Sequence, residues 1–532
     1  MPDAGKQNKA ASWLISTALT ALLAPLLIFA GPTGVQAEIS QVPLFLTVEV
    51  EPNIVFVIDD SGSMHFETLP DEVTMDTFGG LEWWHRGVFY MFPPADRIYG
   101  GDTDYWRSST YRGFNLHNIP GFGATDRWAA FFRSHHNNAM YYNPQTRYLP
   151  WVSADGTPWP DADPGAAYHN PADTGKGSRN LTANNWQYAC WINPTASTWT
   201  SNWGLCSSES RSFYPATYFN YQGGDVDEAS SYERIEIKSG NGPFAGSPKR
   251  TDCADPDACT YEEEIQNFAN WYTYHRSRIL TSRGGIGRAF AAQGEDIRVG
   301  YGTINAGSSY LDSEASPGTM VRGVRSFSGS DREDFFSLLY ERDIPLSGTP
   351  LRRALDDVGQ YYTREDARGP WNTTPGATGG SNLACRNSYT VLMTDGYWNV
   401  GNEHAARHSS RRANVDNQNG PSILNPIPLA ENFQYTPEPP YQDVWTDTLA
   451  DVAMYYWNRD LCPNISNRVP TSVFNEAYWQ SMVTFGVGLG VSGTLDPETD
   501  LDSLKSGDIE WPDPTTDTVS YTHLTLPTKR IV

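Results

Sequence analysis

Short apolar stretches alternate with amphipathic helical patterns along much of the chain, and this alternation limits the possible folds strongly. The stretches that read as buried strands are residues 53–58, 297–304, 388–396 and 482–491. The stretches whose apolar spacing predicts helices are residues 262–292, 349–362 and 446–459. Apolar strands separated by helices are typical of a parallel sheet that is covered by helices on both faces. We therefore expect an α/β fold with an open, mostly parallel sheet.

A different kind of sequence separates the first strand from the first helix. Residues 65–261 are rich in Trp, Tyr, Asn, Gly and Pro, and they show little helical periodicity. We interpret them as a loop-rich insertion into an α/β domain made of residues 38–64 and 262–495. The aromatic side chains of this insertion fit the core of a small lobe and a ligand-binding platform equally well.

The N-terminus has the pattern of a secretory signal peptide. Lys6 and Lys9 precede an apolar run over residues 11–30, and small residues follow up to Ala37. We expect residues 1–37 to be removed on export, which leaves no membrane span in the mature protein. An uncleaved transmembrane helix is the alternative, because the apolar run nears spanning length.

The cysteine count fits an exported protein, and the net charge is unfavourable for binding polyanions. The six cysteines all follow the predicted signal peptide, and an even number in an exported chain fits disulfides. Proximity favours Cys190 with Cys206 and Cys253 with Cys259, although the sequence does not fix the connectivity. The chain has 38 basic and 62 acidic residues, a net charge of −24. This charge argues against nucleic acid and anionic membranes as direct partners.

Oxygen-bearing side chains stand where predicted strands end. Asp59, Ser61 and Ser63 form an Asp-x-Ser-x-Ser motif after the first strand. Asp395 ends a later strand, and Thr349 precedes a helix as its expected N-cap. Because parallel strands end at one sheet edge, where ligands bind, we expect all five to converge. Hydroxyl and carboxylate oxygens suit Mg²⁺, Mn²⁺ or Ca²⁺, and we expect Mg²⁺ first.

Two alternatives compete with a binding role for this metal site. A polar turn explains the motif alone, but it explains neither Thr349 nor Asp395. A hydrolase that uses the ion to activate water would need a general base, and we expect no histidine or glutamate beside the motif segments. The chain also lacks Gly-x-Ser-x-Gly, a phosphate-cradling loop and His-Glu-x-x-His. We therefore predict a binding protein, not an enzyme, with Asp60 pointing away from the metal.

These residues resemble the metal-ion-dependent adhesion site of von Willebrand factor A domains. The resemblance implies that Ser61, Ser63 and Thr349 coordinate the metal directly, while Asp59 and Asp395 act largely through water. It also implies an open coordination position that accepts a carboxylate from a partner.

A narrower resemblance comes from seven stretches that occur in order between residues 53 and 514. They are "NFANWYTYHRSRIL", "GIGRAF", "IPLSGTPLRRAL", "LMTDGYWN", "LADVAMYYWNRDL", "MVTFGVGLGVSGTL" and "WPDP". They are similar to the N-terminal half of the PilY-type adhesins of the type IV pilus tip. The resemblance implies an exported protein at the outer membrane or pilus tip, acting in pilus assembly, retraction control, surface attachment and twitching motility. The implied partners are pilus minor subunits and carboxylate-bearing ligands on host or abiotic surfaces. An exported von Willebrand A protein unrelated to pili is the alternative.

The last residues of the chain are a separate matter. PilY-type proteins continue into a β-propeller with its own calcium loop, and we expect residues 496–519 to begin the linker toward such a domain. Residues 520–532, "SYTHLTLPTKRIV", continue no upstream pattern and resemble translated sequencing-adapter sequence. We interpret them as an artefactual tail on a truncated sequence, and the calcium-regulated functions of the family are not carried over.

Overall fold

The computed structural model describes the part of the chain that carries the predicted α/β domain and much of the insertion. The described residues are 50–69, 90–93, 119–193, 206–345, 347–396, 405–411, 413–472, 475–490, 493–496 and 499–514. The predicted signal peptide and the predicted artefactual tail lie outside them. No helix within the described ranges has both the length and the apolar character needed to cross a membrane.

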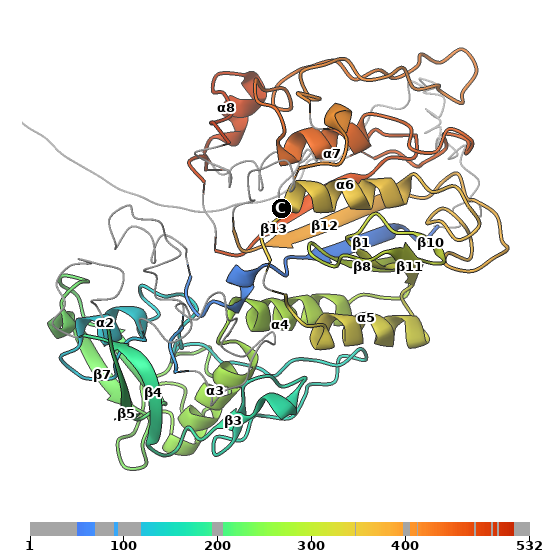
Figure 1. Ribbon diagram of the computed structural model, residues 1–532. Coiled ribbons are helices and arrows are strands. Elements are labelled where there is room, and N and C mark those ends of the chain that lie inside the picture. The colour runs from blue at the N-terminus through green and yellow to red at the C-terminus, as the bar shows by residue number, and fades with distance from the viewer. Residues whose placement is uncertain are drawn as a thin grey trace, which may run out of the picture. The chain divides into compact units, whose positions relative to one another are not determined.

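A five-stranded sheet forms the centre of the α/β domain (Figure 1). In spatial order its strands are β11 (Met320–Ser326), β8 (Arg298–Thr303), β1 (Asn53–Ile58), β12 (Ser388–Thr394) and β13 (Val483–Gly488). The four strands β8, β1, β12 and β13 run parallel, and β11 pairs antiparallel at the edge. Ile58 is level with Thr303 on β8 and with Met393 on β12. The predicted mostly parallel sheet is confirmed, and its three middle strands end at one edge.

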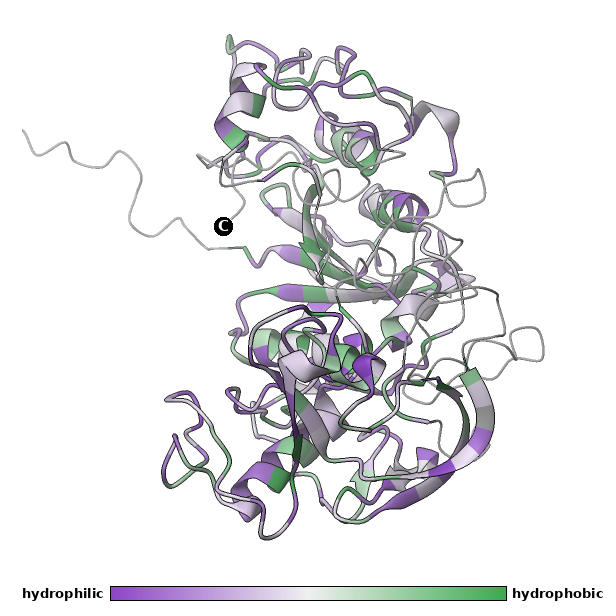
Figure 2. Ribbon diagram, turned by 90° about the vertical axis from the view of Figure 1, so that its left-hand side faces the viewer, coloured by the Kyte–Doolittle hydropathy of each residue, from purple (hydrophilic) through white to green (hydrophobic). Residues whose placement is uncertain are grey.

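Helices cover both faces of the sheet, as the alternation of strands and helices predicted. Figure 1 shows α4 (Arg278–Ala291) and α5 (Gly329–Glu341) on one face, with α6 (Leu351–Tyr362) and α7 (Leu449–Trp457) on the other. The side chains of β1 alternate between these two layers. Phe56 and Ile58 join the core beneath α4 and α5, while Val55 and Val57 join the core beneath α6 and α7. Figure 2 shows hydrophobic colour along these strands and hydrophilic colour along much of the connecting chain.

Two expectations about the helices are wrong. The helix predicted over residues 262–292 is two helices, α3 (Tyr261–Tyr274) and α4, because the chain turns at His275 and buries Arg276 and Arg278. Thr349 is not a helix cap, since α6 begins at Leu351 after Pro350 and has no side-chain cap hydrogen bond. The helix α5 was not predicted, although its Phe and Leu residues have helical spacing.

The described part of the insertion consists of small hairpins and loops. Its elements are α2 (Arg127–Phe132), β2 (Ala167–Tyr168), β3 (Ser178–Arg179), β4 (Asn185–Ile192), β5 (Cys206–Phe213), β6 (Thr217–Tyr221) and β7 (Tyr232–Glu236). The two predicted disulfides, Cys190 with Cys206 and Cys253 with Cys259, are both present. The remaining short elements of the described chain are β9 (Tyr310–Leu311), β10 (Glu314–Ala315), α8 (Leu501–Ser506) and four 3-10 turns, Gly62–His65, Thr174–Lys176, Ala229–Ser231 and Ser409–Arg411.

Most of the described aromatic residues of the insertion form core, and this core is continuous with the layer beneath α4 and α5. Trp151 is buried and stacks on Tyr340 of α5 at a centroid distance of 4.7 Å. Its indole N–H lies 3.1 Å from the carbonyl oxygen of Leu280 in α4. Trp186 and Tyr188 on β4 differ, because 71% and 55% of their surfaces are exposed. The insertion is therefore packed against the α/β domain through shared aromatic side chains.

Candidate metal site

The first strand of the sheet brings the Asp-x-Ser-x-Ser motif to the edge where the parallel strands end. Asp59 directly follows β1, and its backbone N–H donates to the carbonyl of Met393 at 2.8 Å, which extends the pairing with β12. The backbone N–H of Ser61 donates to the Asp59 carboxylate at 2.7 Å. This Asx-type turn ends the strand and begins the 3-10 turn Gly62–His65. The local sequence thus folds its two serines back over the strand end.

Hydrogen bonds join four of the five predicted residues. The hydroxyl oxygens of Ser61 and Ser63 are 3.0 Å apart, and the Ser63 hydroxyl donates to Asp395 Oδ1 at 2.9 Å. Asp59 Oδ2 accepts a hydrogen bond of 2.6 Å from the hydroxyl of Thr394, the last residue of β12. Residues from two neighbouring strand ends therefore form one connected cluster of oxygen atoms, as the sheet-edge argument predicted.

The fifth residue, Thr349, lies in a loop that is attached to this cluster. Thr349 is buried. The carbonyl of Ser347, two residues earlier, accepts a hydrogen bond of 3.1 Å from the backbone N–H of Gly62 within the motif. The amide of Asn305 also donates to the carbonyl of Gly348 at 2.9 Å. The loop before α6 is thus held against the motif from two sides.

Asp60 takes no part in the hydrogen-bonded cluster. Its Oδ1 accepts a hydrogen bond of 2.8 Å from the backbone N–H of Asn305, which follows β8. Asp60 is buried, and burial raises its pKa. The side chain at this x position of the motif therefore supports the neighbouring strand end.

Sequence reasoning missed one charged residue that touches the cluster. The guanidinium of Arg278, at the start of α4, donates to Asp395 Oδ2 at 2.9 Å, and both side chains are fully buried. The sequence held a signal for it, since Arg278 stands next to "ILTS" at the start of a buried helix. An arginine in such a position needs a carboxylate partner, because an unpaired buried charge is costly. The sequence alone did not show which carboxylate that was.

The electrostatics of the cluster favour a cation. Burial raises the pKa of Asp59, and hydrogen bonds from Ser61 and Thr394 lower it only in part. A buried carboxylate that is held by neutral donors gains most from a positive charge placed beside it. The cluster thus offers hydroxyl oxygens and a carboxylate that is not fully compensated by its hydrogen bonds.

The spacing of the two serine oxygens fits an octahedral metal ion. Two ligands at right angles, each about 2.1 Å from Mg²⁺, are about 3.0 Å apart. The Ser61 and Ser63 hydroxyl oxygens are separated by 3.0 Å. Within the described ranges, no group of three or more His, Cys, Asp or Glu side chains is arranged to hold a metal. A metal at this edge would therefore depend on the hydroxyl groups as ligands.

The expectation about a general base needs correction. His65 and Glu67 follow the motif closely, and both are buried. The Nε2 atom of His65 lies 3.4 Å from the carbonyl oxygen of Ile344. Glu67 accepts hydrogen bonds from Arg276 Nε at 3.0 Å and from the backbone N–H of Met91 at 2.6 Å. These contacts engage both side chains in holding the segment after the motif.

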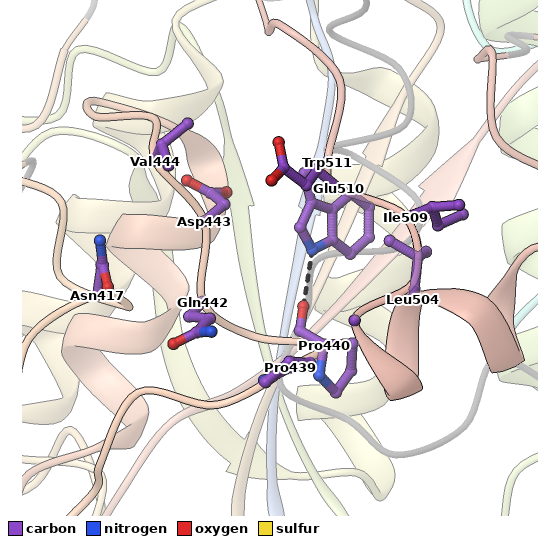
Figure 3. A pocket seen from close by; sticks show the side chains of 11 residues that line it. Asn417, Pro439, Pro440, Gln442, Asp443, Val444, Leu504, Ile509, Glu510 and Trp511 are labelled. Carbon is purple, nitrogen blue, oxygen red and sulfur yellow. Dashed lines mark hydrogen bonds between the residues drawn. The ribbon is translucent and has the colours of Figure 1, made fainter.

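A separate cavity lies away from the cluster. It has a volume of about 210 Å³ and is lined by residues of two segments, 439–444 and 504–511, together with Asn417. Figure 3 shows Trp511 in its wall, with the indole N–H donating to the Pro440 carbonyl at 2.7 Å. The cavity shares no lining residue with the oxygen cluster, so it is a distinct feature of the fold.

The chain is an α/β protein with a mainly parallel sheet, and its candidate cation site lies where the strand order reverses at β1. The chain is similar to proteins of the PilY type. It is 26% identical over 536 aligned positions to the protein named "Type IV pilus biogenesis factor PilY1" of Pseudomonas aeruginosa strain PAK. It is 28% identical over 488 positions to the protein of the same name from strain UCBPP-PA14.

These matches cover most of the chain but a minor part of its relatives. The match to the strain PAK protein covers 93% of this chain and 38% of the relative, and the match to the UCBPP-PA14 protein covers 86% and 33%. No family model matches the chain, and no solved structure matches it.

Proposed function

We propose that this chain is a type IV pilus biogenesis factor whose α/β domain is a von Willebrand factor A domain with a metal-ion-dependent adhesion site. Ser61, Ser63 and Thr349 coordinate a divalent cation, Mg²⁺ before Mn²⁺ or Ca²⁺. Asp59 and Asp395 hold the coordinating groups from behind. The protein acts by binding, not by catalysis. The names of the relatives support the pilus role, and the chemistry of the candidate site supports the adhesive role.

The single observation that carries the metal site is the pair of serine hydroxyls 3.0 Å apart, one of which donates to Asp395 at the next strand end. Neutral hydroxyl ligands would leave most of the positive charge on a bound cation. Mg²⁺ would supply a Lewis-acidic centre that accepts a carboxylate oxygen from outside. The protein's own part is to hold its hydroxyls at octahedral spacing and to keep one direction open.

The setting for this activity is the pilus. The protein is exported through the periplasm to the outer membrane or pilus tip, where pilus minor subunits and acidic surface ligands are its partners. Pilus assembly, control of retraction, surface attachment and twitching motility depend on this contact. The names of the relatives support the first of these functions, and the others extend it through the metal site.

The test replaces the chromosomal gene with Asp59→Ala, and with Asp502→Ala as a matched control whose carboxylate is 97% exposed on α8. Loss of the gene should reduce surface pili, and Asp59→Ala should reduce surface attachment and twitching at unchanged protein level. A chelator should reproduce the Asp59→Ala defect in the parent strain. Normal piliation after gene deletion would contradict the pilus role, and normal attachment by the Asp59→Ala strain would contradict the metal site.

A further inference from the structure

A buried arginine is fixed directly behind the candidate metal site. The backbone N–H of Arg278 donates to the carbonyl of Phe66 at 3.0 Å, and its Nε donates to the carbonyl of Thr68 at 2.9 Å. Its Nη1 donates to Asp395 Oδ2 at 2.9 Å. The guanidinium is therefore held by the segment after the motif and points its charge at the end of β12.

This arginine changes the net charge of the site. Three aspartates, Asp59, Asp60 and Asp395, are buried at the strand ends. Asp395 is paired with Arg278, and Asp60 is attracted electrostatically by Arg342. Asp59 is held by the neutral donors of Ser61 and Thr394. With both arginines counted, a bound divalent cation would leave the site with one net positive charge. Without Arg278 the site would be neutral.

We propose that Arg278 is a positioning and specificity-determining residue, which keeps a bound cation electrophilic toward an acidic partner at the expense of cation affinity. The proposal rests on the metal site of the proposed function. By pairing with Asp395 Oδ2, Arg278 occupies one oxygen of that carboxylate and leaves Oδ1 to the Ser63 hydroxyl. By its charge, it repels the cation and attracts the carboxylate of the partner.

A purely structural role for Arg278 predicts the opposite effect on the metal. If the arginine only tethered Phe66 and Thr68, its loss would loosen the motif, and cation affinity would fall. If its charge opposes the cation, its loss raises cation affinity, since like charges a few ångströms apart repel strongly in a buried setting. The sign of the change in affinity therefore separates the two roles.

The experiment is a calorimetric titration of the full chain with Mn²⁺, followed by titration of the Mn²⁺-loaded protein with a short glutamate-containing peptide. Arg278→Met should bind Mn²⁺ on the order of tenfold more tightly and the peptide on the order of tenfold more weakly. Arg278→Lys keeps the charge and should stay close to the parent protein in both measurements. A folded Arg278→Met that binds Mn²⁺ equally or more weakly would overturn the proposal.

A second variant covers the case in which Arg278→Met does not fold, since that variant leaves the Asp395 carboxylate buried without its guanidinium partner. Arg278→Gln is that variant, because its side-chain amide can still donate a hydrogen bond toward Asp395 while the positive charge is removed. Its Mn²⁺ affinity should rise on the order of tenfold, because the charge that repels the cation is gone. Equal or weaker Mn²⁺ binding by the folded Arg278→Gln protein would overturn the charge role. Absence of Mn²⁺ binding by the parent protein would instead refute the metal site itself.

Discussion

The proposed metal site depends on the positions of single side-chain oxygen atoms at the edge of the sheet. Ser61 and Ser63 present hydroxyls at the separation of two octahedral ligands, and Ser63 also donates to Asp395. Arg278, at the start of α4, donates to the same aspartate. The ligand chemistry and the charge of the site are therefore set by side chains that come from different parts of the sequence.

Ser63→Ala should remove a proposed metal ligand with little damage to the fold. We expect Mg²⁺ affinity to fall by at least about tenfold, since this hydroxyl is a ligand in the proposed site and also donates to Asp395. The cost in unfolding free energy should be about 1 kcal/mol, because Arg278 still pairs with Asp395. Calorimetric titration and urea unfolding of the purified variant measure the two effects. Unchanged Mg²⁺ affinity would show that the serine is no ligand.

The rule that parallel strands end at one edge was enough to predict the residues that carry the cluster. It placed Asp59, Ser61, Ser63 and Asp395 together from the positions of two apolar strands. It did not predict Arg278, because the partner of a buried charge depends on packing between elements that are distant in sequence. The local pattern misassigned Thr349 as a helix cap. A Thr-Pro pair before an apolar run looks the same whether the threonine caps the helix or lies in the loop before it.

Among the contacts between elements, a buried aspartate of α7, Asp451, lies close to a buried aspartate of the preceding loop, Asp416. Asp416 is buried, and neither of its carboxylate oxygens accepts a hydrogen bond of normal geometry in the part of the chain that the structure describes. Burial and the nearby charges of Asp451 and Asp443 raise the pKa of Asp416 to about 9. Burial likewise raises the pKa of Asp451 to about 7. The folded state thus binds protons here that an unfolded chain releases near pH 4.

This cluster should make the protein less stable as pH rises. The folded pKa of Asp416 lies above its unfolded value, so stability is highest below about pH 4 for this group and is lost progressively up to about pH 9. Asp416→Asn should remove that loss and stabilise the protein at pH 8 by at least about 1 kcal/mol relative to its effect at pH 5. Urea unfolding at the two pH values in EDTA measures the difference. Equal effects at pH 5 and pH 8 would contradict the raised pKa.

Contacts between elements also explain why the helix predicted over residues 262–292 is divided into two. The apolar spacing on both sides of His275 fits a helix, so periodicity alone cannot reveal a break. The break is required by Arg276 and Arg278, whose side chains reach Glu67 and Asp395 in the interior. Residues that pair with distant acids override local helical preference, and single-sequence patterns do not contain that information.

On the scale of the whole molecule, the insertion and the α/β domain share one aromatic core. Trp151 packs on Tyr340, and the Tyr340 hydroxyl donates to the Val152 carbonyl at 2.8 Å. A Cβ atom on Gly287 would lie 1.9 Å from that hydroxyl, so α4 approaches this contact as closely as a glycine allows. The sequence predicts the sheet and its two helix layers, but it does not predict this interface, which depends on contacts between distant segments.

Trp151→Ala should therefore destabilise the α/β domain as well as the insertion. We expect a loss of about 3–5 kcal/mol, the usual cost of removing a buried Trp side chain. Because the core is shared, thermal unfolding should show one transition in both the far-ultraviolet and near-ultraviolet circular dichroism signals. Trp186→Ala, at an exposed position on β4, is the matched control and should change little. Two separate transitions would contradict a single core.

The proposed function requires the oxygen cluster at the ends of β1 and β12 to bind a divalent cation, and titration calorimetry with Mg²⁺ measures this binding. The parent protein, freed of metal with EDTA and dialysed, should bind one Mg²⁺, and Asp502→Ala should bind it equally well. Asp59→Ala should fold and show no such binding. Absence of binding by the parent protein, or equal binding by the Asp59→Ala protein, would contradict a metal site at this edge of the sheet.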